Sequence, residues 1–287
     1  MISMRRRMTG FAFWGFCVLA FLFIAAPSIS IIESIIRQAA PVLSWSLLTS
    51  SKGNGLANAI LGSLILLLGV LIVAGIIGVA AGTYLAEYAT GRPRRLLRFF
   101  SEILAGMPSI VIGYIGYVSL VVGLHWQFSL AAGIIALSVL VLPYIVKTTE
   151  VSLMQVPTAL REAASGLGMP RWQTLRRILI PTALPGISSG IIVALAISTG
   201  ELAPLLFTAG PTLNGSASFA LTHTNHGIGL PYLTDVVFFN QTQGETAQSP
   251  HIAAAAGLVL LVILIILIVL GRIVSQRARR QTARMAL

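Results

Sequence analysis

Six apolar segments, each about long enough to cross a bilayer as a helix, constrain the fold of this chain more than any other feature. Of its 287 residues, 56% are hydrophobic and only 9% are charged, which is far too apolar for a soluble domain of this size. The sequence therefore predicts an all-α, polytopic membrane protein with six transmembrane helices, at about residues 11–32, 58–85, 100–123, 129–146, 184–207 and 252–270.

The first apolar segment follows three arginines at positions 5–7. The order of basic, apolar and small residues also fits a cleaved signal peptide. We favour a spanning helix, because the apolar run is longer than that of a usual signal peptide and the topology requires it. The chain then divides into an N-terminal spanning helix with its outer connection, a transmembrane domain and a basic cytoplasmic tail, at residues 1–54, 55–272 and 273–287.

The basic residues between the apolar segments predict the side on which each loop lies. When the N-terminus is placed inside, only Arg37 and Lys52 of the 19 Lys and Arg residues fall outside. By the positive-inside rule, this bias places both termini in the cytoplasm. The net charge of +11 is then explained by basic cytoplasmic loops. We therefore expect the lipid bilayer, and no nucleic acid, as a partner.

Motifs for catalysis and metal binding are missing from the sequence. It contains no GxxxxGK[ST] phosphate-binding loop and no cluster of His, Cys and acidic residues with metal-ligand spacing. A single cysteine excludes a disulfide framework. His223, His226 and His251 lie in or beside the longest outer loop, residues 209–250, without further ligands. We expect no enzyme activity, metal or cofactor in this chain, so that any ATP hydrolysis belongs to another chain.

Residues 157–181 form a charged loop between two apolar segments. Its four arginines cannot lie in hydrocarbon without a large cost: Arg161, Arg171, Arg176 and Arg177. Four apolar residues recur with the spacing of one helix face, namely Leu160, Ala163, Ala164 and Leu167. Gly168 and Pro170 end this helix, and a second short helix from Arg171 to Leu179 is closed by Pro181. The apolar face needs a protein surface to cover it, although an amphipathic helix lying on lipid remains the alternative.

The same loop resembles the EAA loop of permeases from ATP-binding-cassette (ABC) importers. The resemblance rests on the triplet Glu162-Ala163-Ala164, on Gly168 and on the pair Ile180-Pro181. In that family the loop is a coupling helix that docks into a groove on the cytoplasmic ATPase. The resemblance implies that the residues in contact with the ATPase are Leu160, Arg161, Glu162, Ala163, Ala164, Leu167 and Gly168.

Glu201 is the one carboxylate deep in an apolar segment, which makes it a functional candidate by default. The alternative is a structural tether that hydrogen-bonds a neighbouring helix. A low dielectric favours the protonated acid unless a cation is near. The neutral acid could donate a hydrogen bond to an oxyanion, whereas the ionised form could hold a basic residue of a partner.

The string GELAPLLFTA, which contains Glu201, is similar to GETAPLLFTA of the phosphate-specific permeases, the PstA type. Four further strings are similar to the same family, at residues 55–60, 81–88, 108–113 and 147–150. The resemblance implies a type I ABC importer permease of MetI-like architecture that moves inorganic phosphate across the cytoplasmic membrane by alternating access. It also implies candidates for the translocation pathway, namely Glu201, Lys147, Ser109 and Thr199.

The resemblance implies several partners: a second, homologous permease subunit that forms a heterodimer, a dimer of ABC ATPases that binds ATP and Mg, and an extracytoplasmic phosphate-binding protein. The outer loop is then either a solvated cap or a docking surface for the binding protein. Glycines in the apolar segments let helices approach closely, within this chain or against the second permease.

Two positions depart from the family pattern. Many relatives have arginine where this chain has Ile197 and Lys147. Lysine is a point charge without the bidentate geometry of arginine, so we expect the anion contacts to lie mostly on the partner permease. A permease for another oxyanion, such as molybdate or sulfate, and a stand-alone secondary transporter are the alternative functions.

Overall fold

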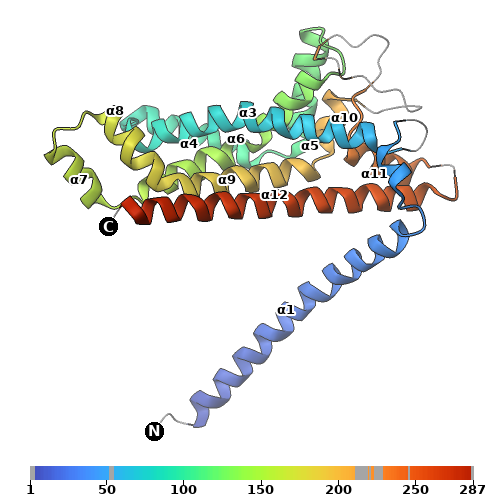
Figure 1. Ribbon diagram of the computed structural model, residues 1–287, viewed down its shortest axis with the longest axis horizontal. Helices are drawn as coiled ribbons and strands as arrows, with labels where there is room; N and C mark the ends of the chain where they lie inside the picture. The colour runs from blue at the N-terminus through green and yellow to red at the C-terminus, as the bar shows by residue number, and fades with distance from the viewer. Residues whose placement is uncertain are drawn as a thin grey trace.

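The computed structural model describes residues 4–51, 55–210, 219, 221–222, 229–244 and 246–285, and the regular elements within them are all helices. Four long helices run side by side along the molecule (Figure 1): α3 (Ala57–Glu87), α6 (Leu130–Met154), α9 (Ile180–Gly200) and α12 (Ser249–Met285). α3 packs on α6, α6 on α9 and α9 on α12. The predicted all-α fold is confirmed.

Helix α1 (Met4–Ala39) contacts α12 and extends away from the bundle in Figure 1. Most of its apolar side chains from Phe13 onward are exposed, so lipid or another chain must cover them. At the end of α1 that meets the bundle, the imidazole Nδ1 of His251 lies 2.7 Å from the Gln38 carbonyl oxygen and donates a hydrogen bond to it. A short helix, α2 (Trp45–Thr49), connects α1 to α3.

The third apolar segment is a bent pair of helices and not the straight span predicted for residues 100–123. Helix α4 (Gly91–Gly106) is followed by α5 (Ser109–Gly116) and its π-helical continuation η1 (Tyr117–Gly123), with a bend of 103°. Pro108 cannot donate a helical hydrogen bond, and it holds Met107 in an extended conformation. In the described residues, five single helices are long and apolar enough to cross a membrane, and the bent pair makes a sixth.

The charged loop holds α7 (Thr158–Gly166), which lies at the same end of the bundle as the C-terminus (Figure 1). The prediction that a second short helix ends at Pro181 is wrong. Instead α8 (Arg171–Thr174), the π-helical turn η2 (Leu175–Leu179) and α9 follow without interruption. Pro181 is the second residue of α9 and follows the π-helical turn directly, and the helix continues through it.

The fifth apolar segment is also interrupted within the predicted range 184–207. Helix α9 ends at Gly200, and α10 (Ala203–Thr208) begins after two non-helical residues. Pro204 explains the break, because its ring would clash with the carbonyl group of Gly200 in a continuous helix. The two interrupted helices meet, since α10 packs on α5.

Small residues bring the helices of this chain close together. A Cβ atom at Gly82 on α3 would lie 2.6 Å from Cβ of Thr149 on α6, and one at Gly113 on α5 would lie 2.8 Å from Cα of Pro204. By contrast, Gly106 has no such neighbour within 4 Å. Most of these glycines therefore serve packing within the chain.

The described part of the outer loop is folded against the bundle. Helix α11 (Leu233–Thr242) packs on α12 and α3. Leu230, Tyr232 and Leu233 are buried, and the backbone N–H of Leu233 donates to the Ser63 hydroxyl at 2.9 Å. The stretch at residues 229–235 is therefore not a solvated cap, whereas residues 241–244 are exposed. His223 and His226 lie outside the described residues, and the described ones contain no group of metal-binding side chains.

Candidate functional site

One guanidinium group joins α7 to two long helices. Nη1 of Arg161 lies 2.7 Å from Oε2 of Glu87, the last residue of α3. Nη2 of the same side chain donates to the Leu153 carbonyl on α6 at 2.8 Å. The side chains of Arg161 and Glu87 are only 30% and 15% exposed, so this ion pair is better shielded from solvent than a surface salt bridge. Arg161 therefore connects α7 to the ends of α3 and α6.

The rest of the α7 helix offers its surface to another molecule. Ala164 is its only buried residue, while Leu160, Glu162 and Ala163 are exposed. Leu167, directly after the helix, is 81% exposed. Of the predicted apolar face, Ala164 thus packs inside this chain, and the other members form a partly exposed apolar surface.

Gly168 turns the chain sharply after α7. Its φ of +69° lies in the left-handed region, which favours glycine. This conformation lets the N–H of Met169 bond the Ala164 carbonyl at 3.0 Å. The space beside Gly168 is open, because a Cβ atom placed there would have none of its described neighbours within 4 Å. A larger residue here would strain the turn and project into this open space.

A second charged cluster links α4 to the end of α6. Glu150 is only 2% exposed, and its Oε1 accepts a hydrogen bond from Nε of Arg98 at 3.0 Å as well as one from the Arg98 Nη2. The Arg94 Nη2 lies 3.6 Å from the same oxygen. The sequence alone does not predict this contact, because 52 residues separate Arg98 from Glu150. The one signal in the sequence is the spacing of the two arginines, which places them on one face of a helix.

Lys147 belongs to the same charged region. It is exposed on α6, one turn before Glu150. Together with Arg98, Ser101 and Glu102 it lines a hollow of about 180 Å³ between α4 and α6. The predicted pathway candidate Lys147 thus lies beside charged residues of α4. The sequence places the α4 arginines in a cytoplasmic loop and does not predict this proximity.

The other three pathway candidates lie elsewhere. Glu201 caps the C-terminus of α9 at the break before α10. Its backbone N–H donates to the Ser198 carbonyl at 3.4 Å, and its own carbonyl accepts a hydrogen bond from the Thr234 hydroxyl at 3.3 Å. Thr199 is buried and donates to the Leu195 carbonyl at 2.8 Å. Ser109 is half-buried at the first position of α5. Glu201 and Thr199 therefore lie at one interrupted helix, Ser109 lies at the other, and Lys147 is separate from all three.

Hydroxyl groups gather beside the α9 break. Ser63, Ser198, Thr199, Tyr232 and Thr234 line a small cavity of about 20 Å³. Burial, and then the nearby carboxylate of Asp235, raise the pKa of Tyr232 well above its ordinary value. The Tyr232 hydroxyl therefore stays protonated, and its oxygen has no hydrogen-bond partner in the described residues.

Comparison with known proteins identifies relatives over most of the chain. Residues 78–280 match the family described as "Binding-protein-dependent transport system inner membrane component". The chain is 43% identical over 285 residues to "Phosphate transport system permease protein PstA 2" of Mycobacterium bovis, which covers 98% of this chain and 92% of that protein. It is 36% identical over 273 residues to "Phosphate transport system permease protein PstA" of Xylella fastidiosa, covering 93% and 92%.

Two solved structures share the fold. A chain of a bacterial ABC transporter involved in alginate import matches with a TM-score of 0.65 and 16% identity, over 95% of this chain and 96% of that chain. A chain of the MetNI methionine ABC transporter in an inward-facing conformation matches with a TM-score of 0.62 and 19% identity, over 78% and 95%. The predicted MetI-like architecture and the resemblance to phosphate permeases are confirmed. This chain belongs to the family of inner membrane components of binding-protein-dependent transport systems, whose ABC importer permeases cross the cell membrane several times.

Proposed function

We propose that this chain is the transmembrane permease subunit that lets an ATP-driven importer move inorganic phosphate across the cytoplasmic membrane by alternating access. The similarity to phosphate transport system permeases over nearly the whole chain carries this proposal. The segment that resembles the phosphate family most closely, residues 200–209, coincides with the α9–α10 break. Interrupted helices are common at the substrate sites of membrane transporters.

The pathway runs past the two breaks. Irregular backbone at membrane depth is tolerated where protein buries it or where it lines a water-filled cavity. α5 and α10 pack together directly after their breaks, which brings Ser109 and Glu201 onto neighbouring interrupted helices. Lys147 and the α4 arginines lie nearer the end of the bundle that carries α7. A phosphate ion would therefore meet Thr199 and Glu201 before it meets the cations.

Coupling to ATP hydrolysis occurs through α7. A partner ATPase dimer that binds ATP and Mg covers the exposed surface of Leu160, Ala163 and Leu167, with Glu162 at its edge. The closing of the ATPase moves α7, and the contacts of Arg161 transmit that movement to α3 and α6. This chain itself hydrolyses nothing, because its part is to change which side of the membrane the pathway faces.

Three further assignments complete the proposal. α7 and both termini are cytoplasmic, which agrees with the 17 Lys and Arg residues on that side in the positive-inside prediction. A second, homologous permease covers the exposed apolar faces and completes the pathway. An extracytoplasmic phosphate-binding protein delivers the anion at the end that carries α11.

Uptake of radiolabelled phosphate in cells with and without this chain tests the proposal. Excess arsenate, molybdate and sulfate serve as competitors. We expect uptake at low micromolar phosphate to disappear without the chain, and only arsenate to compete. If cells without the chain lose molybdate or sulfate uptake and keep phosphate uptake, the proposal that phosphate is the substrate is wrong. Uptake that persists without the ATPase would favour a stand-alone secondary transporter.

A further inference from the structure

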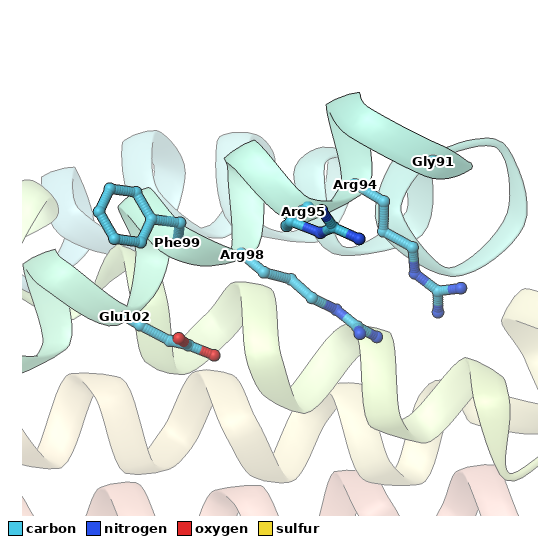
Figure 2. A pocket seen from close by; sticks show the side chains of 6 residues that line it. All are labelled: Gly91, Arg94, Arg95, Arg98, Phe99 and Glu102. Atoms are coloured by element: carbon cyan, nitrogen blue, oxygen red, sulfur yellow. The ribbon is translucent and has the colours of Figure 1, made fainter.

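An open groove with basic walls runs along the surface of α4. It has a volume of about 390 Å³ and is lined by Gly91, Arg94, Arg95, Arg98, Phe99 and Glu102. These residues form two adjacent rows with a spacing of four, one through positions 91, 95 and 99 and the other through 94, 98 and 102. Figure 2 shows Arg94, Arg98 and Glu102 reaching from α4 toward the neighbouring helix. The groove lies between the two rows, as the packing of side chains on a helix predicts.

The groove runs along a helix that packs on α6, so it is not an ordinary loop surface. At 1.5 Å per residue, Gly91 and Glu102 are about 16 Å apart along the helix axis. This is about half of the 30 Å thickness of a typical hydrocarbon layer. Wherever this length lies within the hydrocarbon layer, its charged side chains face water or a partner and not lipid, because exposure to hydrocarbon costs several kcal/mol for each charge, by the order of magnitude of insertion scales. None of the residues of α4 is buried in this chain.

The cations of the groove are only partly neutralised. The Glu150 carboxylate neutralises the Arg98 guanidinium by accepting two hydrogen bonds from it. Arg94 reaches the same carboxylate only at 3.6 Å, and its Nε is buried without an acceptor in the described residues. Arg95 is exposed and forms no ion pair in the described part of the chain. The only acid that lines the groove, Glu102, is at the opposite end from Gly91.

We propose that this groove is a binding site for a phosphate-type oxyanion, with Arg94 and Arg95 as its direct contacts. Planar guanidinium groups match phosphate oxygens in pairs of parallel hydrogen bonds. The positive end of the α4 dipole, at Gly91, adds to their attraction. Arg98 is a positioning residue, because its bonds to Glu150 fix α4 against α6. If the anion is transported phosphate, an inference that rests on the proposed function, the groove is its exit site on the cytoplasmic side.

The same chemistry would also bind the phosphate of a lipid headgroup, and a cysteine-labelling experiment separates the two sources. The complete importer, with Cys17→Ser and Phe99→Cys in this chain, is labelled in inside-out membrane vesicles. Phe99 is exposed and lines the groove without adding charge. We expect a negatively charged methanethiosulfonate to react about tenfold faster than a positively charged one at low salt. High salt should remove the preference.

Matched variants assign the effect to the groove. Arg95→Gln should remove most of the preference, whereas Arg92→Gln, an equal loss of charge on the same helix outside the groove, should leave most of it. Millimolar inorganic phosphate should slow the negative reagent more than sulfate does. The same labelling is repeated in nanodiscs. If phosphatidylglycerol in the nanodisc slows the negative reagent and phosphate does not, the anion bound in the groove is a lipid headgroup. If Phe99→Cys does not assemble, Glu102→Cys provides a second reporter.

Equal rates for the two reagents, or no protection by phosphate or by anionic lipid, would overturn the binding site. Phosphate uptake in the same variants keeps this result separate from the proposed function. Normal phosphate uptake with no charge preference would refute only the groove. Protection by phosphate in an importer that carries another oxyanion would refute only the proposed substrate.

Discussion

Replacing Arg161 with methionine should disconnect α7 from the membrane helices while the importer still assembles. The change removes one hydrogen bond to Glu87 and one to the Leu153 carbonyl, and it keeps most of the apolar stem. A hydrogen bond to a charged group contributes about 1.5–3 kcal/mol. Because Arg161 is partly exposed, solvent reduces this value, and we expect a loss of about 2–4 kcal/mol for the pair of bonds. A loss of this size weakens the linkage of α7 to α3 and α6 by about 30-fold or more, at tenfold for each 1.4 kcal/mol.

Proteoliposomes that contain the complete importer provide the assay, with phosphate uptake and ATP hydrolysis measured in the same sample. We expect Arg161→Met to keep ATP hydrolysis but to lower phosphate uptake per ATP by about tenfold or more, given that loss. Arg171→Met, which removes an exposed arginine of the same loop, should behave nearly as the unmodified protein. Combining Arg161→Glu with Glu87→Arg should restore part of the coupling, because the pair is re-formed but the Leu153 carbonyl loses its donor. Unchanged uptake per ATP in Arg161→Met would refute the role of this contact.

Three further changes have defined outcomes. Gly168→Asp should abolish phosphate uptake with normal membrane insertion, because the new side chain strains the left-handed turn and projects toward the ATPase. Gly168→Ala is the control that measures the strain alone. Uptake near normal in Gly168→Asp would contradict the role of this surface in docking the ATPase. Glu201→Gln should keep uptake if the neutral acid is the working form and lose it if the charge holds a partner's cation, and full uptake in Glu201→Leu would remove this residue from the pathway. Glu150→Gln should destabilise the solubilised complex by about 2 kcal/mol, less than for a fully buried pair because the Arg98 side chain is 38% exposed. Its Tm should be lower than that of Glu102→Gln, and equal Tm values would show that the pair contributes little.

The sequence predicts the helices well where apolar length decides the outcome. The segments that become α3, α6 and α12 are long and apolar enough to be recognised alone. The sequence also predicts α7, since Leu160, Ala163 and Ala164 have helical spacing and Gly168 supplies the turn. The prolines are harder to interpret. Pro108 and Pro204 each break a predicted span, while Pro181, which was expected to end a helix, follows a π-helical turn at the start of α9.

The contacts that connect the site could not be predicted from a single sequence. Arg161 and Glu87 are 74 residues apart, and no local pattern indicates that the ends of α3 and α7 meet. The place of the α4 arginines on a packed helix could not be predicted for a different reason. Positions 91–98 contain four arginines and so resemble a loop, although a helix that faces water within a membrane protein has the same composition. Only the packing of α4 on α6 in the structure distinguishes such a helix from a loop.

The most direct test of the account is ATP-driven accumulation of labelled phosphate in proteoliposomes. These should contain this chain, its partner permease and the ATPase, with the binding protein added outside. The account predicts accumulation that requires ATP, the binding protein and this chain, and that fails for Gly168→Asp despite normal assembly. Accumulation without ATP, or an equal rate when this chain is left out, would contradict it.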